Sequence, residues 1–258
     1  MNQDNCVQHE TAETAQGHIH TLWVNNPARL NILNSATMEA LCSTLEQIAG
    51  DPQARVVVLR GSGERAWIGG ADIREMADLD ANSAVAFIRR VHGVCHALRM
   101  LPIPVVAAIR GYCLGAGLEV AASCDLRLAA HGASFAMPEV RVGLPSVVEA
   151  SLLPRLVGAG RARDLVMTAR TLEADEALRW GLIDALVAND QLDALVNERV
   201  EQLLAGAPAA MRTQKMLCRA WEEQPLSDAI ELSIEAFGKS FESDEPRIRL
   251  QQFLNRKR

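Results

Sequence analysis

The hydrophobic pattern divides the chain into two parts. Up to about Ala136, short apolar or β-branched runs alternate with stretches in which apolar residues recur every three or four positions. The runs that predict strands are 18–24, 55–61, 66–68, 104–111 and 125–130. Strands that alternate with helices are typical of an α/β domain built in layers. The sequence therefore predicts an α/β core.

Three helices are expected between these strands. In the first, Ser35 can cap a helix whose apolar positions recur at spacings of three and four: Met38, Leu41, Leu45 and Ile48. The second is expected over roughly 82–100. The third is expected over 115–124, where small residues suit a tightly buried helix.

After about Ser146 helical patterns dominate the chain. Helices are expected over 146–157, 160–169, 173–181, 191–206, 208–223, 226–240 and 245–256, with one strand-like run at 182–187. No linker rich in Gly, Ser or Pro separates the two parts. We therefore expect three segments: a frayed polar N-terminus over 1–16, the α/β core over 17–195, and a helical region over 196–258.

The charge and cysteine content exclude some classes of protein. With 26 Lys+Arg against 32 Asp+Glu, the formal net charge is −6, the wrong sign for binding nucleic acid or an anionic membrane. No apolar run approaches the roughly 18 residues of a membrane span. The six cysteines form no CxxC pair and follow no apolar leader, which predicts reduced thiols in a cytoplasmic protein.

Two motifs imitate cofactor or metal sites without meeting their requirements. The run GSGERA at 61–66 resembles a dinucleotide fingerprint, but WIGG follows it where a helix should begin, so a tight turn is expected. His92 and His96 have the spacing of a zinc pair. Gly93 stands where a metalloprotease has glutamate, and no third ligand lies nearby in sequence, so a surface or interface histidine pair is favoured.

Two glycine-rich segments predict free backbone N–H groups. In WIGGADIREM (67–76), glycines end a strand before a helix start near Ala71, and in GYCLGAGLEVAASCD (111–125) Ala116 falls at another helix start. Such N–H groups can bind an oxyanion or a phosphate. For the first segment, a plain turn with Asp72 as a first-turn acid is an equally good interpretation.

Two glutamates lie in apolar surroundings. Glu119 follows Ala116 by three residues, and Glu139 lies in FAMPEVRVGLP (135–145). A solvent-facing position at a helix start is the alternative for Glu119, but its apolar neighbours disfavour it. Adding water to an activated double bond needs one group to take a proton from water, another to give one to carbon, and N–H donors for the enolate oxygen.

These motifs together resemble the crotonase (enoyl-CoA hydratase/isomerase) superfamily. WIGGADIREM looks like its GADI-x-EM segment, GYCLGAGLEVAASCDLRLAA looks like its glycine-rich segment with the first glutamate, and FAMPEV stands where the family places the second. The resemblance covers about residues 17–258. It implies a spiral of ββα units, a helical C-terminal region that forms trimers or pairs of trimers, and an acyl-CoA thioester substrate. It implies no metal and no cofactor, since coenzyme A is part of the substrate.

The resemblance also implies roles for particular residues. The N–H groups of Ala71 and Ala116 would form the oxyanion hole, and Glu119 and Glu139 would be the catalytic pair. As a hypothesis, Glu119 deprotonates water and protonated Glu139 supplies the proton to the α-carbon. Residues that would border coenzyme A are Ala71, Asp72, Ile73, Arg74 and Arg29, with Arg256 and Lys257 available to a neighbouring subunit. For Arg29, Arg256 and Lys257, a solvated surface charge is the favoured alternative.

The chain departs from the family pattern at two places. Ala116 stands where glycine is common, and PSVVEA (145–150) replaces a glycine-rich loop that borders the acyl pocket. Glu149 in this loop is either an additional site carboxylate or, as we favour, half of a capping box with Ser146. The predicted function is enoyl-CoA hydration. The alternatives are double-bond isomerisation, thioester hydrolysis, or a non-catalytic acyl-CoA-binding subunit.

Overall fold

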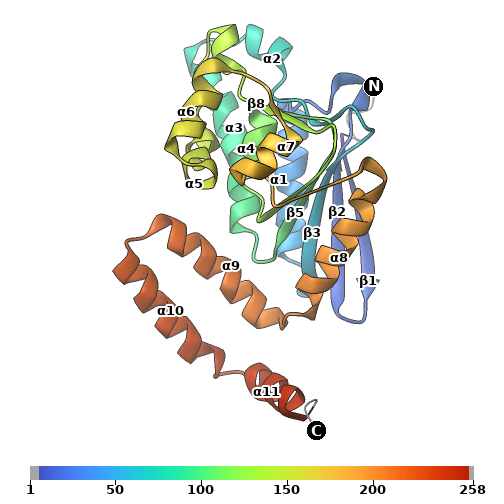
Figure 1. Ribbon diagram of the computed structural model, residues 1–258, viewed down its shortest axis with the longest axis vertical. Coiled ribbons are helices and arrows are strands. Elements are labelled where there is room, and N and C mark those ends of the chain that lie inside the picture. The colour runs from blue at the N-terminus through green and yellow to red at the C-terminus, as the bar shows by residue number, and fades with distance from the viewer. Residues whose placement is uncertain (1–5, 256–258) are drawn as a thin grey trace.

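Two sheets form the centre of the molecule. The computed structural model describes residues 6–255 (Figure 1). The larger sheet has the order β1-β2-β3-β5-β7-β10, and the smaller has the order β4-β6-β8-β9. The strands are β1 (Val7–Thr14), β2 (Gly17–Val24), β3 (Ala54–Gly61), β4 (Ala66–Ile68), β5 (Val105–Ile109), β6 (Tyr112–Leu114), β7 (Leu126–Ala130), β8 (Ser134–Ala136), β9 (Leu172–Glu173) and β10 (Ala185–Val187).

Helices cover these sheets and make up most of the second half of the chain. The α-helices are α1 (Ser35–Ala49), α2 (Ile73–Ala77), α3 (Ala81–Met100), α4 (Ala116–Ala122), α5 (Leu153–Val157), α6 (Ala159–Thr168), α7 (Ala174–Trp180), α8 (Leu192–Ala205), α9 (Pro208–Glu223), α10 (Leu226–Ser240) and α11 (Glu245–Asn255). The 3₁₀ helices are η2 (Pro27–Arg29), η3 (Glu139–Val142), η4 (Val148–Leu152) and η5 (Asn189–Gln191). No helix in residues 6–255 is long and apolar enough to cross a membrane.

The core repeats one unit of two strands followed by a helical segment. In the pairs β3/β4, β5/β6 and β7/β8, the first strand joins the larger sheet and the second joins the smaller one. Successive units add parallel neighbours, with β3 beside β5 beside β7 and β4 beside β6 beside β8. This arrangement confirms the predicted α/β class. It also brings the ends of β4, β6 and β8 to one edge of the smaller sheet.

The predicted frayed N-terminus is wrong for Val7–Thr14. This segment is β1, which pairs antiparallel with β2 from Val7 opposite Val24 to Thr14 opposite Gly17. The sequence VQHETAET does not predict this strand. Seven of its eight residues are exposed, so it lacks the apolar alternation of a half-buried strand. Gly17, at φ +115°, closes the hairpin. Residues 1–5 lie outside the described residues.

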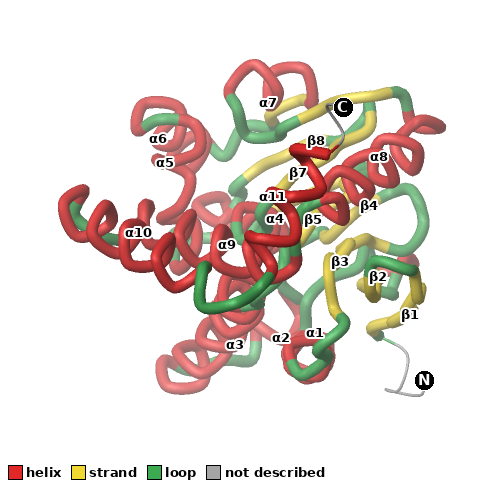
Figure 2. Tube along the Cα trace, turned by 90° about the horizontal axis from the view of Figure 1, so that it is seen from below, coloured by secondary structure: helices red, strands yellow, loops and turns green. Residues whose placement is uncertain are grey.

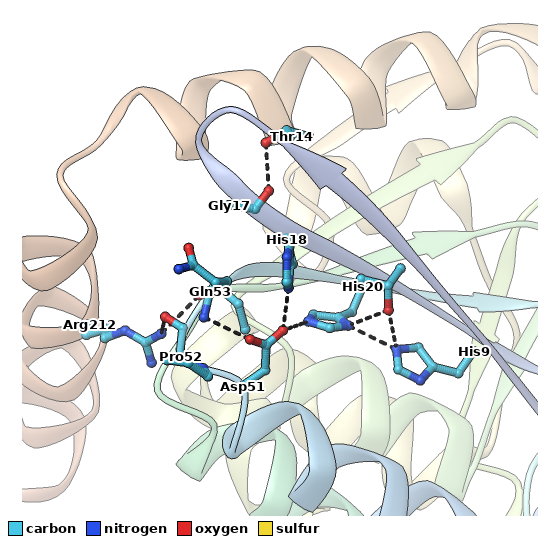
Figure 3. A network of polar contacts seen from close by, with 11 residues as sticks. His9, Thr14, Gly17, His18, His20, Asp51, Pro52, Gln53 and Arg212 are labelled. Carbon is cyan, nitrogen blue, oxygen red and sulfur yellow. Dashed lines mark hydrogen bonds and ion pairs between the residues drawn. The ribbon is translucent and has the colours of Figure 1, made fainter.

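A polar network fastens this hairpin to the end of α1 (Figure 3). Asp51 Oδ2 lies 2.7 Å from His18 Nδ1 and 3.1 Å from His20 Nε2. On its other side, His20 Nδ1 lies 3.0 Å from His9 Nε2 and 3.2 Å from Thr11 Oγ1. Because His20 is only 4% exposed, these partners compensate for burying its two ring nitrogens.

The predicted apolar stripe of α1 is confirmed: Met38, Leu41, Leu45 and Ile48 are buried. The cap is one residue earlier than expected, because Asn34 Oδ1 accepts the N–H of Thr37 at 2.8 Å. Ser35 is instead the first helical residue, and its N–H and hydroxyl both donate to the Glu75 carboxylate on α2. Ser35 thus ties the start of α1 to α2.

Of the last three helices, α9 is anchored to the core, and α10 and α11 lie beyond it. α8 packs on the larger sheet, whereas α10 and α11 extend away from the strands (Figure 1), and α9 and α10 lie side by side (Figure 2). Lys215 holds α9 to the core through hydrogen bonds of 2.9 Å to the carbonyls of Leu98 and Ile103. Beyond this anchor, α10 and its C-cap residue carry large exposed apolar side chains: Leu226, Ile230, Ile234 and Phe237 on the helix, and Phe241 at the cap.

Candidate active site

Two neighbouring strands of the smaller sheet deliver two glycine turns to the same edge. β4 and β6 are parallel, and both end before a helix start. Gly70, at φ +111°, follows β4, and a Cβ there would lie 3.1 Å from the carbonyl oxygen of Leu114 on β6. Gly115, at φ +52°, follows β6. Glycine allows both the positive φ and the close approach of the two turns.

Each turn presents a backbone N–H immediately after its glycine. Ala116 is the first residue of α4, and Ala71 precedes Asp72, the N-cap of α2. Within residues 6–255, neither N–H donates to a backbone carbonyl. The β-bridge between Leu33 and Ala71 is formed by the neighbouring groups instead: the Leu33 N–H donates to the Gly70 carbonyl, and the Asp72 N–H donates to the Leu33 carbonyl. Two free donors at one edge are what an oxyanion hole requires.

Glu119 lies one turn into α4 and is only 4% exposed, so the solvent-facing alternative is wrong. Its Oε1 accepts the N–H of Ala150 at 3.1 Å. Burial raises the pKa of Glu119 to about 8, with the Ala150 hydrogen bond acting against it and the nearby charges of Glu139 and Glu149 adding to it. At neutral pH, Glu119 therefore holds a proton in the substrate-free chain.

Glu139 is the first residue of η3, and its carboxyl lies beside the Gly115 turn that precedes α4. Its Oε2 accepts the Ser146 hydroxyl at 2.8 Å. A Cβ on Gly115 would lie 2.5 Å from its Oε1, so the carboxyl rests against the start of α4. Since the charge of Glu139 also acts on Glu119, the structure brings together the two predicted carboxylates and the Ala116 turn.

The predicted capping box of Ser146 and Glu149 is wrong. Ser146 donates to Glu139, and the helix starts at Val148 as η4 with no side-chain cap. Glu149 is 7% exposed, and its Oε1 lies 2.7 Å from His92 Nδ1 on α3. A capping box needs an α-helical first turn at Ser146, which this loop does not form. Glu149 instead lies close enough to Glu119 for its charge to raise the pKa of that carboxyl, and its role as a site carboxylate stays a prediction.

The residues expected to border coenzyme A lie around the start of α2. Asp72 is buried and accepts the Arg74 N–H at 3.0 Å, which makes it the cap of α2 rather than a first-turn acid. Ile73 and Arg74 are exposed, and Arg29 Nη1 lies 3.8 Å from Asp72 Oδ2. The structure thus groups Arg29 with Asp72, Ile73 and Arg74. Arg256 and Lys257 lie outside the described residues.

The predictions for the 61–66 segment and for the His92 and His96 pair agree with the structure. The 61–66 segment joins β3 directly to β4, so it is a turn and not a helix start. His92 pairs with Glu149. Among the described residues, a group with the spacing of metal ligands is His18, His20 and Asp51, whose ligand atoms already hydrogen-bond to one another. The expectation of no metal stays a prediction.

Comparison with known proteins identifies the family. A model of the enoyl-CoA hydratase/isomerase family matches residues 14–258. The chain is 33% identical to the short-chain-enoyl-CoA hydratase of Clostridium acetobutylicum over 244 residues, 94% of each chain. It is 32% identical to the crotonyl-CoA hydratase of Syntrophomonas wolfei over 238 residues, 92% of each chain. The chain belongs to the enoyl-CoA hydratase/isomerase family.

The solved structures agree with this family. An enoyl-CoA hydratase from Bacillus anthracis gives a TM-score of 0.92 at 29% identity, covering 98% of this chain and 97% of that one. The predicted crotonase-type fold and an enzyme of the hydratase type are therefore confirmed. Membership in the enoyl-CoA hydratase/isomerase family does not by itself assign Glu149, because the 145–150 loop is where this chain departs from the expected motif.

Three contacts within the candidate site were not predicted from the sequence. They are the Ser146 hydroxyl on Glu139, the Ala150 N–H on Glu119, and the His92 ring on Glu149. A backbone donor such as Ala150 leaves no signal in a side-chain pattern. Glu149 did leave one, because it stands among apolar residues just as Glu119 and Glu139 do.

Proposed function

We propose that this enzyme adds water reversibly to the double bond of a 2-enoyl-CoA thioester. The observation that carries the proposal is the convergence of Glu119 and Glu139 beside the free N–H groups that follow two glycine turns. The named activities of the relatives, short-chain-enoyl-CoA hydratase and crotonyl-CoA hydratase, support the same reaction.

The oxyanion hole activates the substrate. The thioester oxygen would accept hydrogen bonds from Ala71 N–H and Ala116 N–H, which draws electron density away from the β-carbon. When water adds there, the enolate oxygen gains negative charge and both hydrogen bonds strengthen. Removing one such donor typically costs about 10²–10³ in kcat.

The two glutamates handle the protons. In the proposed step Glu119 takes a proton from water as the new C–O bond forms at the β-carbon, and Glu139 gives its proton to the α-carbon. Glu119 ends protonated and Glu139 ionised, and the pair returns to its starting state by exchanging one proton. Because burial places the proton on Glu119 in the substrate-free chain, that proton has to pass to Glu139 when substrate binds.

Hydration of crotonyl-CoA, followed by loss of the conjugated-thioester absorbance, tests the proposal. Glu119→Gln and Glu139→Gln should each lower kcat by about 10²–10⁴. Near-full hydration by either variant would refute the assignment. An isomerase or a hydrolase would instead convert a 3-enoyl-CoA or release free coenzyme A, and a non-catalytic subunit would do none of these.

Proton exchange separates the roles of the two glutamates. A saturated acyl-CoA such as butyryl-CoA exchanges its α-protons with D₂O only through the group that faces the α-carbon. We expect Glu139→Gln to abolish this exchange and Glu119→Gln to keep it. The opposite result would reverse the two roles while leaving the site intact.

The exposed apolar face of α10 supports a homotrimer or a pair of trimers. Leu226, Ile234 and Phe237 are 77%, 60% and 71% exposed, and a contiguous patch of this kind marks an interface. Light scattering should give a mass of three or six chains. Ile234→Glu together with Phe237→Glu should shift that mass to one chain.

The remaining proposals concern the cellular compartment, the partners and the following reaction. The cysteines are all free, which supports the cytoplasm. We expect no nucleic-acid or membrane partner and no cofactor beyond the coenzyme A of the substrate. The product, a 3-hydroxyacyl-CoA, would suit a following oxidation, as in β-oxidation of fatty acids.

A further inference from the structure

The loop that replaces the expected glycine-rich segment holds a third carboxyl group beside the site. Glu149 Oε1 is bound by His92 Nδ1 at 2.7 Å. Glu149 Oε2 is buried and has no hydrogen-bond partner within the described residues. Leaving a buried oxygen unpaired destabilises a fold by about 1–3 kcal/mol, so this carboxyl has an unfavourable position that calls for an explanation.

The backbone of the same loop is strained. Val148 has φ +38°, a left-handed conformation that β-branched residues rarely adopt. Such residues cost about 1–3 kcal/mol and persist only where surrounding contacts hold them. Three contacts around Val148 are available for this: the Ala150 N–H on the Val147 carbonyl, the same N–H on Glu119, and the Glu149 carboxyl on His92.

This loop acts on Glu119 in two ways. The N–H of Ala150 is shared: it donates to the Glu119 carboxyl at 3.1 Å and to the Val147 carbonyl at 2.9 Å within the turn. The charge of Glu149 is also close enough to act on Glu119. Both effects depend on the turn at 148–150, which packs against α3 and α4.

We propose that Glu149, anchored by His92, is a positioning residue that holds the strained turn at Val148 so that the Ala150 N–H stays on the Glu119 carboxyl. The proposal rests on the proposed role of Glu119 in hydration. His92 is half-exposed, so its ring can be changed without opening the core.

The two effects of the loop on the pKa of Glu119 have opposite signs. The Ala150 hydrogen bond lowers this pKa, and the charge of Glu149 raises it. The other titratable groups near Glu119 are Glu139, on η3, and Cys95, on α3, whose own pKa is raised by burial so that it stays a thiol. Glu149→Gln removes the charge and can keep the bond to His92, whereas His92→Ala removes the anchor and keeps the charge.

The experiment is a ¹³C NMR titration of the Glu119 carboxyl, assigned by its absence in Glu119→Gln, together with kcat and KM for crotonyl-CoA. We expect Glu149→Gln to lower the titration midpoint by about one pH unit. His92→Ala should raise the midpoint and lower kcat about tenfold, with little change in KM. His96→Ala is the matched control, since His96 lies one turn along α3, its ring centroid 5.6 Å from that of His92.

Rescue gives a second test of the turn. Glycine adopts φ +38° without strain, so Val148→Gly should restore most of the kcat lost in His92→Ala. Unmoved midpoints in both Glu149→Gln and His92→Ala would overturn the proposal, as would a His96→Ala variant that behaves like His92→Ala. If the unmodified chain does not hydrate crotonyl-CoA, the proposed function fails, but the titration midpoints still decide the role of Glu149.

Discussion

The site positions its backbone N–H groups in two different ways. Ala71 and Ala116 follow glycines whose positive φ values cost nothing, at the ends of two paired strands. Ala150 follows a turn in which Val148 takes a positive φ that costs free energy, and side-chain contacts hold that turn. The first arrangement is a property of the local sequence. The second depends on residues from α3 and α4, so it can be altered from a distance.

The largest effect is expected at the glycine turns. Gly115→Ala places a methyl group 2.5 Å from Glu139 Oε1, so it should displace that carboxyl and lower kcat about a hundredfold. Gly132→Ala is the matched control, because Gly132 also has a positive φ but a Cβ there meets nothing within 4 Å. Equal losses of activity in both variants would mean that backbone strain alone is responsible.

The pH dependence of kcat/KM tests whether Glu119 and Glu139 share one proton in the reaction. The reaction needs one proton on the glutamate pair, and the pKa of Glu119 is about 8. We therefore expect kcat/KM to be level near neutral pH and to fall about tenfold per pH unit above about 8. A rate that keeps rising well above pH 8 would contradict a shared proton.

The free energy of unfolding offers an independent test of the raised pKa of Glu119. The pKa of Glu119 is raised by burial from 4.5 to about 8, so the cost to the folded state is absent below pH 4.5, grows up to pH 8 and is constant above it. Glu119→Gln should therefore raise the free energy of unfolding by up to about 3 kcal/mol at pH 7, with no gain at pH 4. Denaturant unfolding at the two pH values measures the difference, and equal effects at both would contradict the raised pKa.

The smallest effect is expected at the strained turn in the otherwise unchanged chain. Val148→Gly relieves the left-handed strain but increases the entropy of the unfolded chain and removes packing. We expect the free energy of unfolding to change by less than about 1 kcal/mol, with kcat nearly unchanged. A loss of several kcal/mol would indicate that packing, and not the contacts of Glu149 and Ala150, holds the turn.

The same contrast explains what could be predicted from the sequence. Periodicity and glycine placement located α1, α4, the Ala71 and Ala116 turns and both glutamates of the proposed pair. Periodicity failed for β1, whose side chains are exposed on a polar strand. It also failed at 145–150, where S-x-x-E has the spacing of a capping box but each side chain binds a partner outside the helix. Contacts between distant segments decided both cases.

A crystal structure with a bound saturated acyl-CoA would show directly whether the two backbone N–H groups and the two carboxyls face the same substrate. We expect the thioester oxygen at about 3 Å from both Ala71 N and Ala116 N, with one water molecule held between the carboxyls of Glu119 and Glu139. A thioester oxygen bound away from these two nitrogens, or carboxyls with no shared water between them, would contradict it.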